Sequence, residues 1–107
     1  MSIPNKRLAF LEESVAKGST DPFAWYGLAM EYRKLDRWDD ALRTFEKLRE
    51  IQPDYVAMYL MCGQMLEGRA RKAEARAWYV DGVNRAKQKG DAHALSELEG
   101  ALNTLED

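Results

Sequence analysis

Residues 25–53 read WYGLAMEYRKLDRWDDALRTFEKLREIQP, and this stretch decides the fold. Trp25, Leu28 and Tyr32 follow one another at intervals of three and four residues, so they lie on one face of a helix. A second run with the same rhythm carries Ala41, Phe45 and Leu48. Each run has one apolar face to bury, which predicts two amphipathic helices folded back on each other.

The spacing of these residues resembles the tetratricopeptide repeat, whose signature is W-x2-L-G-x2-Y, then A-x3-F, then P. The matching residues are Trp25, Leu28, Ala29, Tyr32, Ala41, Phe45 and Pro53. Ala29 replaces the signature glycine by another small residue, and Leu48 stands where the family usually has a small residue. Pro53 cannot continue a helix and ends the second one. The resemblance implies an all-α fold, an α-α superhelix of packed helical hairpins.

A second copy of the pattern begins at Val56, one family period of about 34 residues after Pro22. Its matching residues are Tyr59, Cys62, Gly63, Leu66, Ala75, Tyr79 and Gly82. Gly63 is the signature glycine that the first copy lacks, whereas Lys87 replaces the final proline. We therefore expect two full hairpins, repeat 1 at residues 22–55 and repeat 2 at residues 56–89.

One further helix is expected on each side of the two hairpins, as terminal caps of repeat arrays usually are. Residues 4–18 form the N-terminal cap helix, in which Asn5 is the N-cap and Gly18 ends the helix. Asp91 introduces the C-terminal cap helix, residues 91–106, with a stripe of leucines on one face. The chain is then a single domain, residues 1–107.

The starts and turns of the hairpins also have sequence signals. Asp21 caps the first hairpin and Pro22 suits the first helical position. We expect one turn at Asp36-Arg37, a second at Gly68, and a C-cap at Gly90.

The amino-acid composition and the N-terminal sequence indicate in which compartment the protein is expected. The chain has 107 residues, a hydrophobic share of 46%, a net charge of −2 and one cysteine. Residues 1–14, MSIPNKRLAFLEES, contain no long apolar run, so neither a signal peptide nor a membrane span is expected. One cysteine fits a reducing compartment, and a cytoplasmic protein is expected. The whole chain resembles small stand-alone tetratricopeptide repeat proteins of bacteria.

The residues needed for catalysis are scarce. Cys62 falls at a core place of a helix, and His93, the one histidine, lies in the first turn of the last helix, where exposure is expected. Nothing in the sequence orients either group as a catalytic pair. Neither a metal-ligand spacing nor a phosphate-binding glycine loop occurs. We expect no enzyme, no metal and no cofactor.

The resemblance also implies a binding surface. In the family, the second, fifth, ninth and twelfth positions of each repeat line a concave groove. Carried over by register, they are Phe23, Tyr26, Met30 and Arg33 in the first repeat, and Ala57, Leu60, Gln64 and Glu67 in the second, with Met61 beside them. Exposed aromatic and methionine side chains mark interaction sites. We therefore expect this surface to bind a peptide or protein partner.

One known family mode does not fit this groove. Co-chaperone repeat domains hold a C-terminal carboxylate with lysine, asparagine and arginine. The matching places hold Tyr26, Met30 and Met61, and Asp91 and Leu95 in the last helix, none of which is a clamp residue. An apolar or amphipathic segment is the expected ligand instead.

Three alternatives stay open. The apolar groove residues could face a second copy of the chain, giving a homodimer, or the N-terminal helix could cover them. A basic cluster of Arg69, Arg71, Lys72 and Arg76 could contact nucleic acid through phosphates. A solvated turn is the favoured explanation of that cluster, because the whole chain is slightly acidic and no aromatic residue is interleaved with the basic ones.

Overall fold

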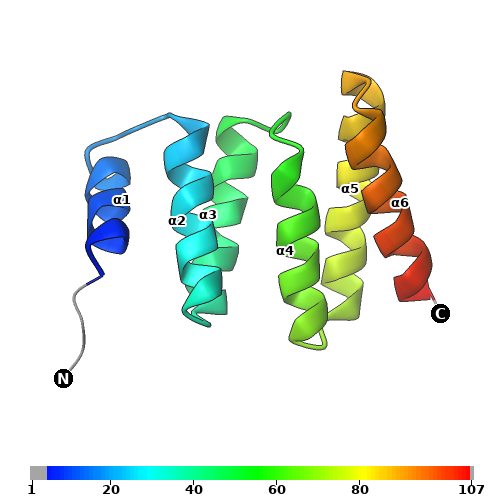
Figure 1. The fold of residues 1–107 in the computed structure, drawn as a ribbon, viewed down its shortest axis with the longest axis horizontal. Coiled ribbons are helices and arrows are strands. Elements are labelled where there is room, and N and C mark those ends of the chain that lie inside the picture. The colour runs from blue at the N-terminus through cyan, green and yellow to red at the C-terminus, as the bar shows by residue number, and fades with distance from the viewer. Residues whose placement is uncertain (1–4, 107) are drawn as a thin grey trace. The chain divides into compact units, whose positions relative to one another are not determined.

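The computed structural model describes residues 5–106, and within that range it contains six helices and no strand. They are α1 (Lys6–Ala16), α2 (Pro22–Lys34), α3 (Trp38–Ile51), α4 (Ala57–Gly68), α5 (Lys72–Lys89) and α6 (Ala92–Glu106) (Figure 1). The all-α fold predicted from the two repeats is confirmed. Residue 4, with which the predicted N-terminal helix begins, lies outside the described range.

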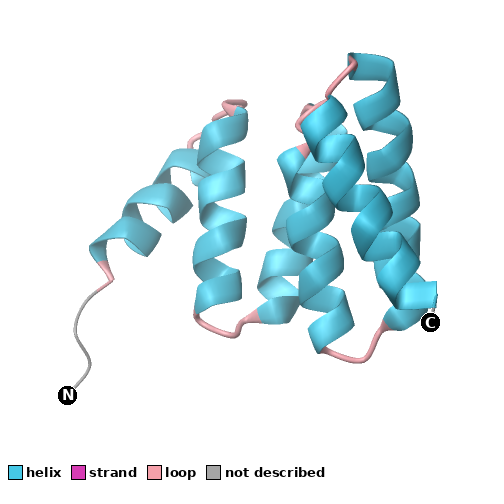
Figure 2. Cartoon of the chain, turned by 45° about the vertical axis from the view of Figure 1, so that its right-hand side comes forward, coloured by secondary structure: helices cyan, strands magenta, loops and turns pink. Residues whose placement is uncertain are grey.

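The chain divides into two compact units, residues 1–52 and residues 53–107. The first unit contains α1, α2 and α3; the second contains α4, α5 and α6. Short loops join successive helices inside each unit (Figure 2). The expected limits of a single domain and of its repeats stay a prediction.

The core of the first unit lies between α2 and α3. Leu28 and Ala29 of α2 are buried, as are Ala41, Phe45 and Leu48 of α3. These are the signature positions of the first repeat. The predicted hairpin is thus confirmed in its residues as well as in its helices.

Helix α1 packs against α2 through both apolar and polar contacts. The side chain of Leu11 is buried, and its methyl groups lie beside Gly27. Glu31 is only 8% exposed; it accepts a hydrogen bond from Asn5 Nδ2 at 3.2 Å and pairs with Arg7 Nε at 3.3 Å. The Tyr32 hydroxyl donates to Glu12 Oε2 at 2.5 Å. The N-terminal helix therefore covers one side of the first repeat, as predicted.

In the second unit α5 is the central helix, since it packs against both α4 and α6. Two glycines allow α5 to approach α4 and α6 closely. The ring of Tyr79 on α5 lies against Gly63 of α4, and Gly82 of α5 lies against Tyr59 and Leu98. The Tyr59 hydroxyl donates to the carbonyl of Pro53 at 2.6 Å. All three of these larger neighbours are buried core residues, so the unit is tightly packed around α5.

The predicted N-caps are all present. Asn5 Oδ1 accepts from the Leu8 amide at 2.9 Å, Asp21 Oδ1 from the Phe23 amide at 3.0 Å, and Asp91 Oδ1 from the Ala94 amide at 3.1 Å. Each satisfies one of the amides that a helix start leaves without a partner. Helix α4 has no capping side chain, and it begins at Ala57, one residue after Val56, where the second copy of the pattern begins.

The turn expected at Gly68 is made two residues later, so that prediction is wrong in detail. Gly68 is still helical, and Ala70 adopts the left-handed conformation with φ of 61°. The Ala70 amide donates to the Glu67 carbonyl and the Arg71 amide to the Leu66 carbonyl, which is a Schellman closure. A local hydrogen-bond pattern, rather than a glycine, therefore ends α4.

The first hairpin has the same closure at the same place of the repeat. Asp36 also has φ of 61°; its amide donates to the Arg33 carbonyl, and the Arg37 amide donates to the Tyr32 carbonyl. In each hairpin the arginine after this residue bonds an acid three residues on: Arg37 to Asp40 and Arg71 to Glu74. The two copies therefore share their turns as well as their cores.

Candidate functional site

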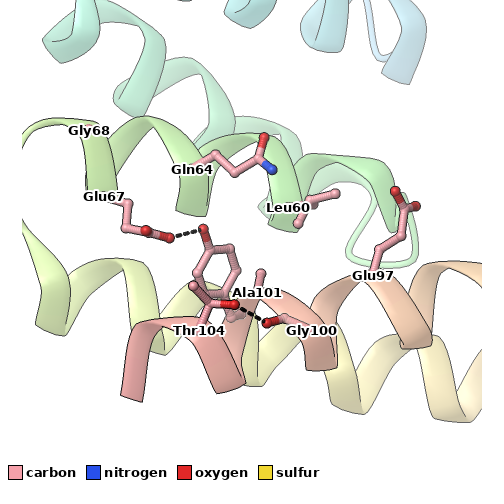
Figure 3. Close-up of a pocket in the computed structure, with 9 residues that line it drawn as sticks. Leu60, Gln64, Glu67, Gly68, Glu97, Gly100, Ala101 and Thr104 are labelled. Carbon is pink, nitrogen blue, oxygen red and sulfur yellow. Dashed lines mark hydrogen bonds between the residues drawn. The ribbon is translucent and has the colours of Figure 1, made fainter. Parts of the chain in front are cut away.

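A pocket of about 600 Å³ opens between α4 and α6 in the second unit (Figure 3). Helix α4 contributes Leu60, Gln64 and Glu67 to one wall. Helix α6 contributes the opposite wall, and Tyr79 of α5 also lines the pocket. Because all three helices belong to one unit, the pocket is a feature of that unit alone.

A smaller cavity of about 140 Å³ continues along the same two helices toward their N-termini. It is lined by apolar residues such as Met61 and Leu98, and it shares Leu60 and Glu97 with the larger pocket. We call the two together the α4–α6 groove. The residues of α4 that line it are Ala57, Leu60, Met61, Gln64 and Glu67, with Val56 just before the helix and Gly68 at its end.

All five site residues predicted in the second copy line this groove. The sequence reasoning missed the wall on α6, which is formed by Ala94, Glu97, Gly100, Ala101 and Thr104, with Leu98 below. The sequence feature that could have indicated this wall is the pair of small residues Ala94 and Ala101 beside the leucine stripe of α6. Helix α6 was expected only as a cap, but its face next to the leucines helps to form the site.

The polar groups of the groove are few. Glu67 Oε1 accepts a hydrogen bond from the Tyr79 hydroxyl at 2.7 Å. Burial and this carboxylate together raise the pKa of Tyr79 far above its usual range, so the phenol is neutral and donates. Glu97 Oε1 lies 3.2 Å from His93 Nε2, and the Thr104 hydroxyl donates to the Gly100 carbonyl at 3.0 Å. The groove therefore combines an apolar floor with carboxylates at its edges.

The four site residues predicted in the first copy all lie on α2, in the other unit. Phe23 is 72% exposed, while Tyr26, Met30 and Arg33 are half-buried. The contacts of α1 described above involve Gly27, Glu31 and Tyr32, which occupy the neighbouring face of α2. The N-terminal helix therefore leaves Phe23 exposed.

The reactive residues of the sequence lie in very different environments. The Cys62 thiol is fully buried, whereas the His93 side chain is 88% exposed. Residues 5–106 contain no cluster of three or more His, Cys, Asp or Glu side chains that could hold a metal ion. Over the same residues, no helix has the length and apolar character needed to cross a membrane.

The basic cluster at the second turn is partly engaged in ion pairs. Arg71 Nε donates to Glu74 Oε1 at 2.6 Å, and Arg69 and Arg76 also have partners. Lys72 is the first residue of α5. These contacts are what a solvated turn would show, and they leave nucleic-acid binding as an alternative without support of its own.

Helical hairpins that recur with one turn geometry define an all-α repeat protein of the kind that carries binding surfaces. Comparison with known proteins makes this specific. The tetratricopeptide repeat family profile matches residues 22–55. The solution structure of a tetratricopeptide repeat domain protein from Salinibacter ruber is 40% identical, with a TM-score of 0.76, covering 80% of this chain and 87% of that one. The chain belongs to the tetratricopeptide repeat family.

Two further solved structures are similar to this chain. A crystal structure of a tetratricopeptide repeat domain protein from Salinibacter ruber is 40% identical, with a TM-score of 0.73, covering 80% of this chain and 96% of that one. A protein from Bordetella parapertussis, 24% identical, has the same fold, with a TM-score of 0.79 over 99% of this chain and 90% of that one. No curated protein matches the chain.

Proposed function

We propose that this protein is an interaction module that binds an apolar or amphipathic peptide segment of a partner protein. The family as a whole mediates contacts between proteins, and the peptide class and the site are specific to this proposal. One observation carries it: the five α4 residues expected to contact a ligand line one continuous groove. Phe23, Tyr26, Met30 and Arg33 of α2 are proposed as further contacts.

The driving force would be burial of apolar surface. Leu60 and Met61 are half-buried in the free protein, so a ligand can still remove part of their surface from water. Such burial contributes about 25 cal/mol per Å², before the entropy lost on association. Gln64 and Glu67 are exposed at the edge and can form hydrogen bonds that fix the direction of a bound segment.

A displayed library of random peptides, selected on the wild-type protein, tests this function. Leu60→Arg places a charge in the groove and should abolish binding of the selected peptides. Ala77→Arg is the matched control, because Ala77 is exposed on α5 and does not line the groove. Binding that survives Leu60→Arg at the wild-type level would contradict the assignment of the groove.

The contribution of α2 is tested separately with Tyr26→Ala combined with Met30→Ala. We expect weaker binding with an unchanged circular dichroism spectrum, because both side chains are half-buried rather than in the core. Wild-type affinity in this double variant would restrict the site to α4 and α6.

Self-association is the second candidate, and the exposure of Phe23 (72%) and Phe10 (67%) favours it. Exposed large aromatic side chains are frequent at interfaces between protein chains. Sedimentation equilibrium over a wide concentration range distinguishes a monomer from a dimer. A dimer that Phe23→Ser dissociates would establish this candidate, and a monomer at high concentration would exclude it.

A further inference from the structure

We propose that the segment bound in the α4–α6 groove is cationic. It would bury an apolar side chain against Leu60 and place Lys or Arg side chains beside Glu67 and Glu97. This inference rests on the proposed peptide-binding function and names the chemical class of its ligand.

The charges that line the groove are all of one sign. Glu67 stands on the α4 wall and Glu97 on the α6 wall, and none of the described residues that line the two cavities is Lys or Arg (Figure 3). Glu67 contacts the neutral Tyr79 hydroxyl, and Glu97 contacts His93, which is charged only when protonated. Neither contact supplies a permanent positive charge to the carboxylate. The two edges therefore carry negative charge that a basic ligand can neutralise.

The helix dipoles act in the same direction. Gly68, the last residue of α4, and Thr104, in the last turn of α6, both line the larger pocket. The C-terminal end of a helix carries a partial negative charge of about half an electron and favours a cation nearby. The larger pocket thus extends to the negative ends of two helices, whereas the smaller cavity lies nearer their positive ends.

The last turns of the helices differ in the basic residues that they carry. The last turns of α2, α3 and α5 carry basic residues of their own: Arg33 and Lys34, Arg49, and Lys87 and Lys89. The last turns of α1, α4 and α6 carry none, although Lys17 directly follows α1 and Arg69 directly follows α4. At the end of α6, no basic residue of the last turn complements the helix dipole.

Three synthetic peptides of one length test the charge of the ligand. All share the same leucine positions at helical spacing, and their remaining positions are Lys in one, Gln in the second and Glu in the third. Fluorescence anisotropy at low and at physiological salt measures their affinity. We expect the Lys peptide to bind most tightly and to lose affinity as salt screens the carboxylates.

Matched variants assign the effect to the groove. Glu67→Gln keeps an acceptor for the Tyr79 hydroxyl while removing the charge, and Glu97→Gln does the same on α6. Each should weaken the Lys peptide by about two- to fivefold, as expected for partly exposed charge pairs, and leave the Gln peptide unchanged. Glu99→Gln is the control, because Glu99 is exposed on the same helix and lines neither cavity.

Several results would overturn the inference. Equal affinity for the Lys, Gln and Glu peptides would leave peptide binding intact and remove the charge preference. An effect of Glu99→Gln as large as that of Glu97→Gln would mean general attraction to an acidic protein. If none of the three peptides binds, and the random library also yields no ligand, both the inference and the proposed function fail.

A second copy of the chain is the remaining occupant to exclude. Sedimentation of the wild type at the concentrations of the binding assay should show a monomer. A dimer that Leu60→Arg dissociates, while Ala77→Arg does not, would place another copy in the groove and overturn the inference.

Discussion

The ring of Tyr79 lies directly on the backbone of Gly63. A Cβ atom placed on Gly63 would come within 2.2 Å of Tyr79 Cε1, closer than any real contact. The ring has little freedom to withdraw, since Tyr79 is fully buried and its hydroxyl is bound to Glu67. This contact therefore fixes the distance between α4 and α5, and with it the position of the α4 wall of the groove.

Gly63→Ala should accordingly destabilise the protein by about 1–3 kcal/mol, the usual cost of overpacking a core. Chemical denaturation followed by circular dichroism measures the free energy of unfolding. Gly100→Ala is the matched control, because nothing lies within 4 Å of its Cβ position. That change should stabilise α6 by about 0.5–1 kcal/mol, since alanine is the better helix former. Equal effects of the two substitutions would show that the Tyr79 contact does not limit packing.

Glu31→Ala should release α1 from the first hairpin. The substitution removes the partner of Asn5 and of Arg7 from a nearly buried site. We expect a loss of about 1–3 kcal/mol and faster amide hydrogen exchange across residues 6–16. Glu13→Ala removes an exposed pair with Lys17 on α1 itself and should cost only a few tenths of a kcal/mol. Unchanged exchange in Glu31→Ala would mean that Leu11 and the Tyr32–Glu12 hydrogen bond are enough to hold the helix.

Alkaline pH should weaken the first unit through Tyr32. Burial, followed by the hydrogen bond to Glu12, raises the pKa of Tyr32 from 10.0 to about 12. The folded state therefore favours the neutral phenol. Its contribution to stability is complete below the unfolded pKa of 10.0 and is lost as the pH rises toward 12.

The measurement is the free energy of unfolding as a function of pH in the wild type and in Tyr32→Phe. At neutral pH the variant should be less stable by about 1 kcal/mol, for the lost hydrogen bond. Between pH 10 and 12 it should lose less stability than the wild type. Parallel curves over that interval would contradict the assignment.

Ala70→Gly should stabilise the protein. Ala70 has φ of 61°, a conformation that costs a residue with a Cβ about 1 kcal/mol and costs glycine nothing. Thermal unfolding should show a gain of up to about 1 kcal/mol, reduced by the greater freedom of glycine in the unfolded chain. Gly90→Ala makes the opposite exchange at φ of 72° and should destabilise. A loss of stability in Ala70→Gly would show that the alanine side chain contributes more than its strain costs.

Most of the fold could be predicted from the sequence, because the signals were local and repeated. Trp25, Leu28 and Tyr32 could belong to any amphipathic helix, but their recurrence in a second copy fixed both the helices and their pairing. The caps at Asn5, Asp21 and Asp91 could also be predicted from the sequence, since a capping side chain acts within three residues of its own position.

The remaining features depend on contacts between distant segments or on conformations that have no sequence signal. Ala70 gave no indication of a left-handed turn, because alanine rarely adopts one, and the nearby Gly68 was the more obvious candidate. The wall formed by Glu97 and Ala101 required knowing how α6 packs on α5. A terminal helix with a leucine stripe is interpreted as a cap. Only the packing of α6 in the structure showed which face beside the leucines lines a cavity.

The equivalence of Asp36 and Ala70 has a consequence for how such a chain can change its length. A recombination event that deletes or duplicates residues 37–70 would join one left-handed turn residue to the segment that normally follows the other. The residue after the new junction would again be an arginine with an acid three positions on. A deletion or insertion of one whole period therefore preserves the left-handed turn and the arginine–carboxylate pair that follows it.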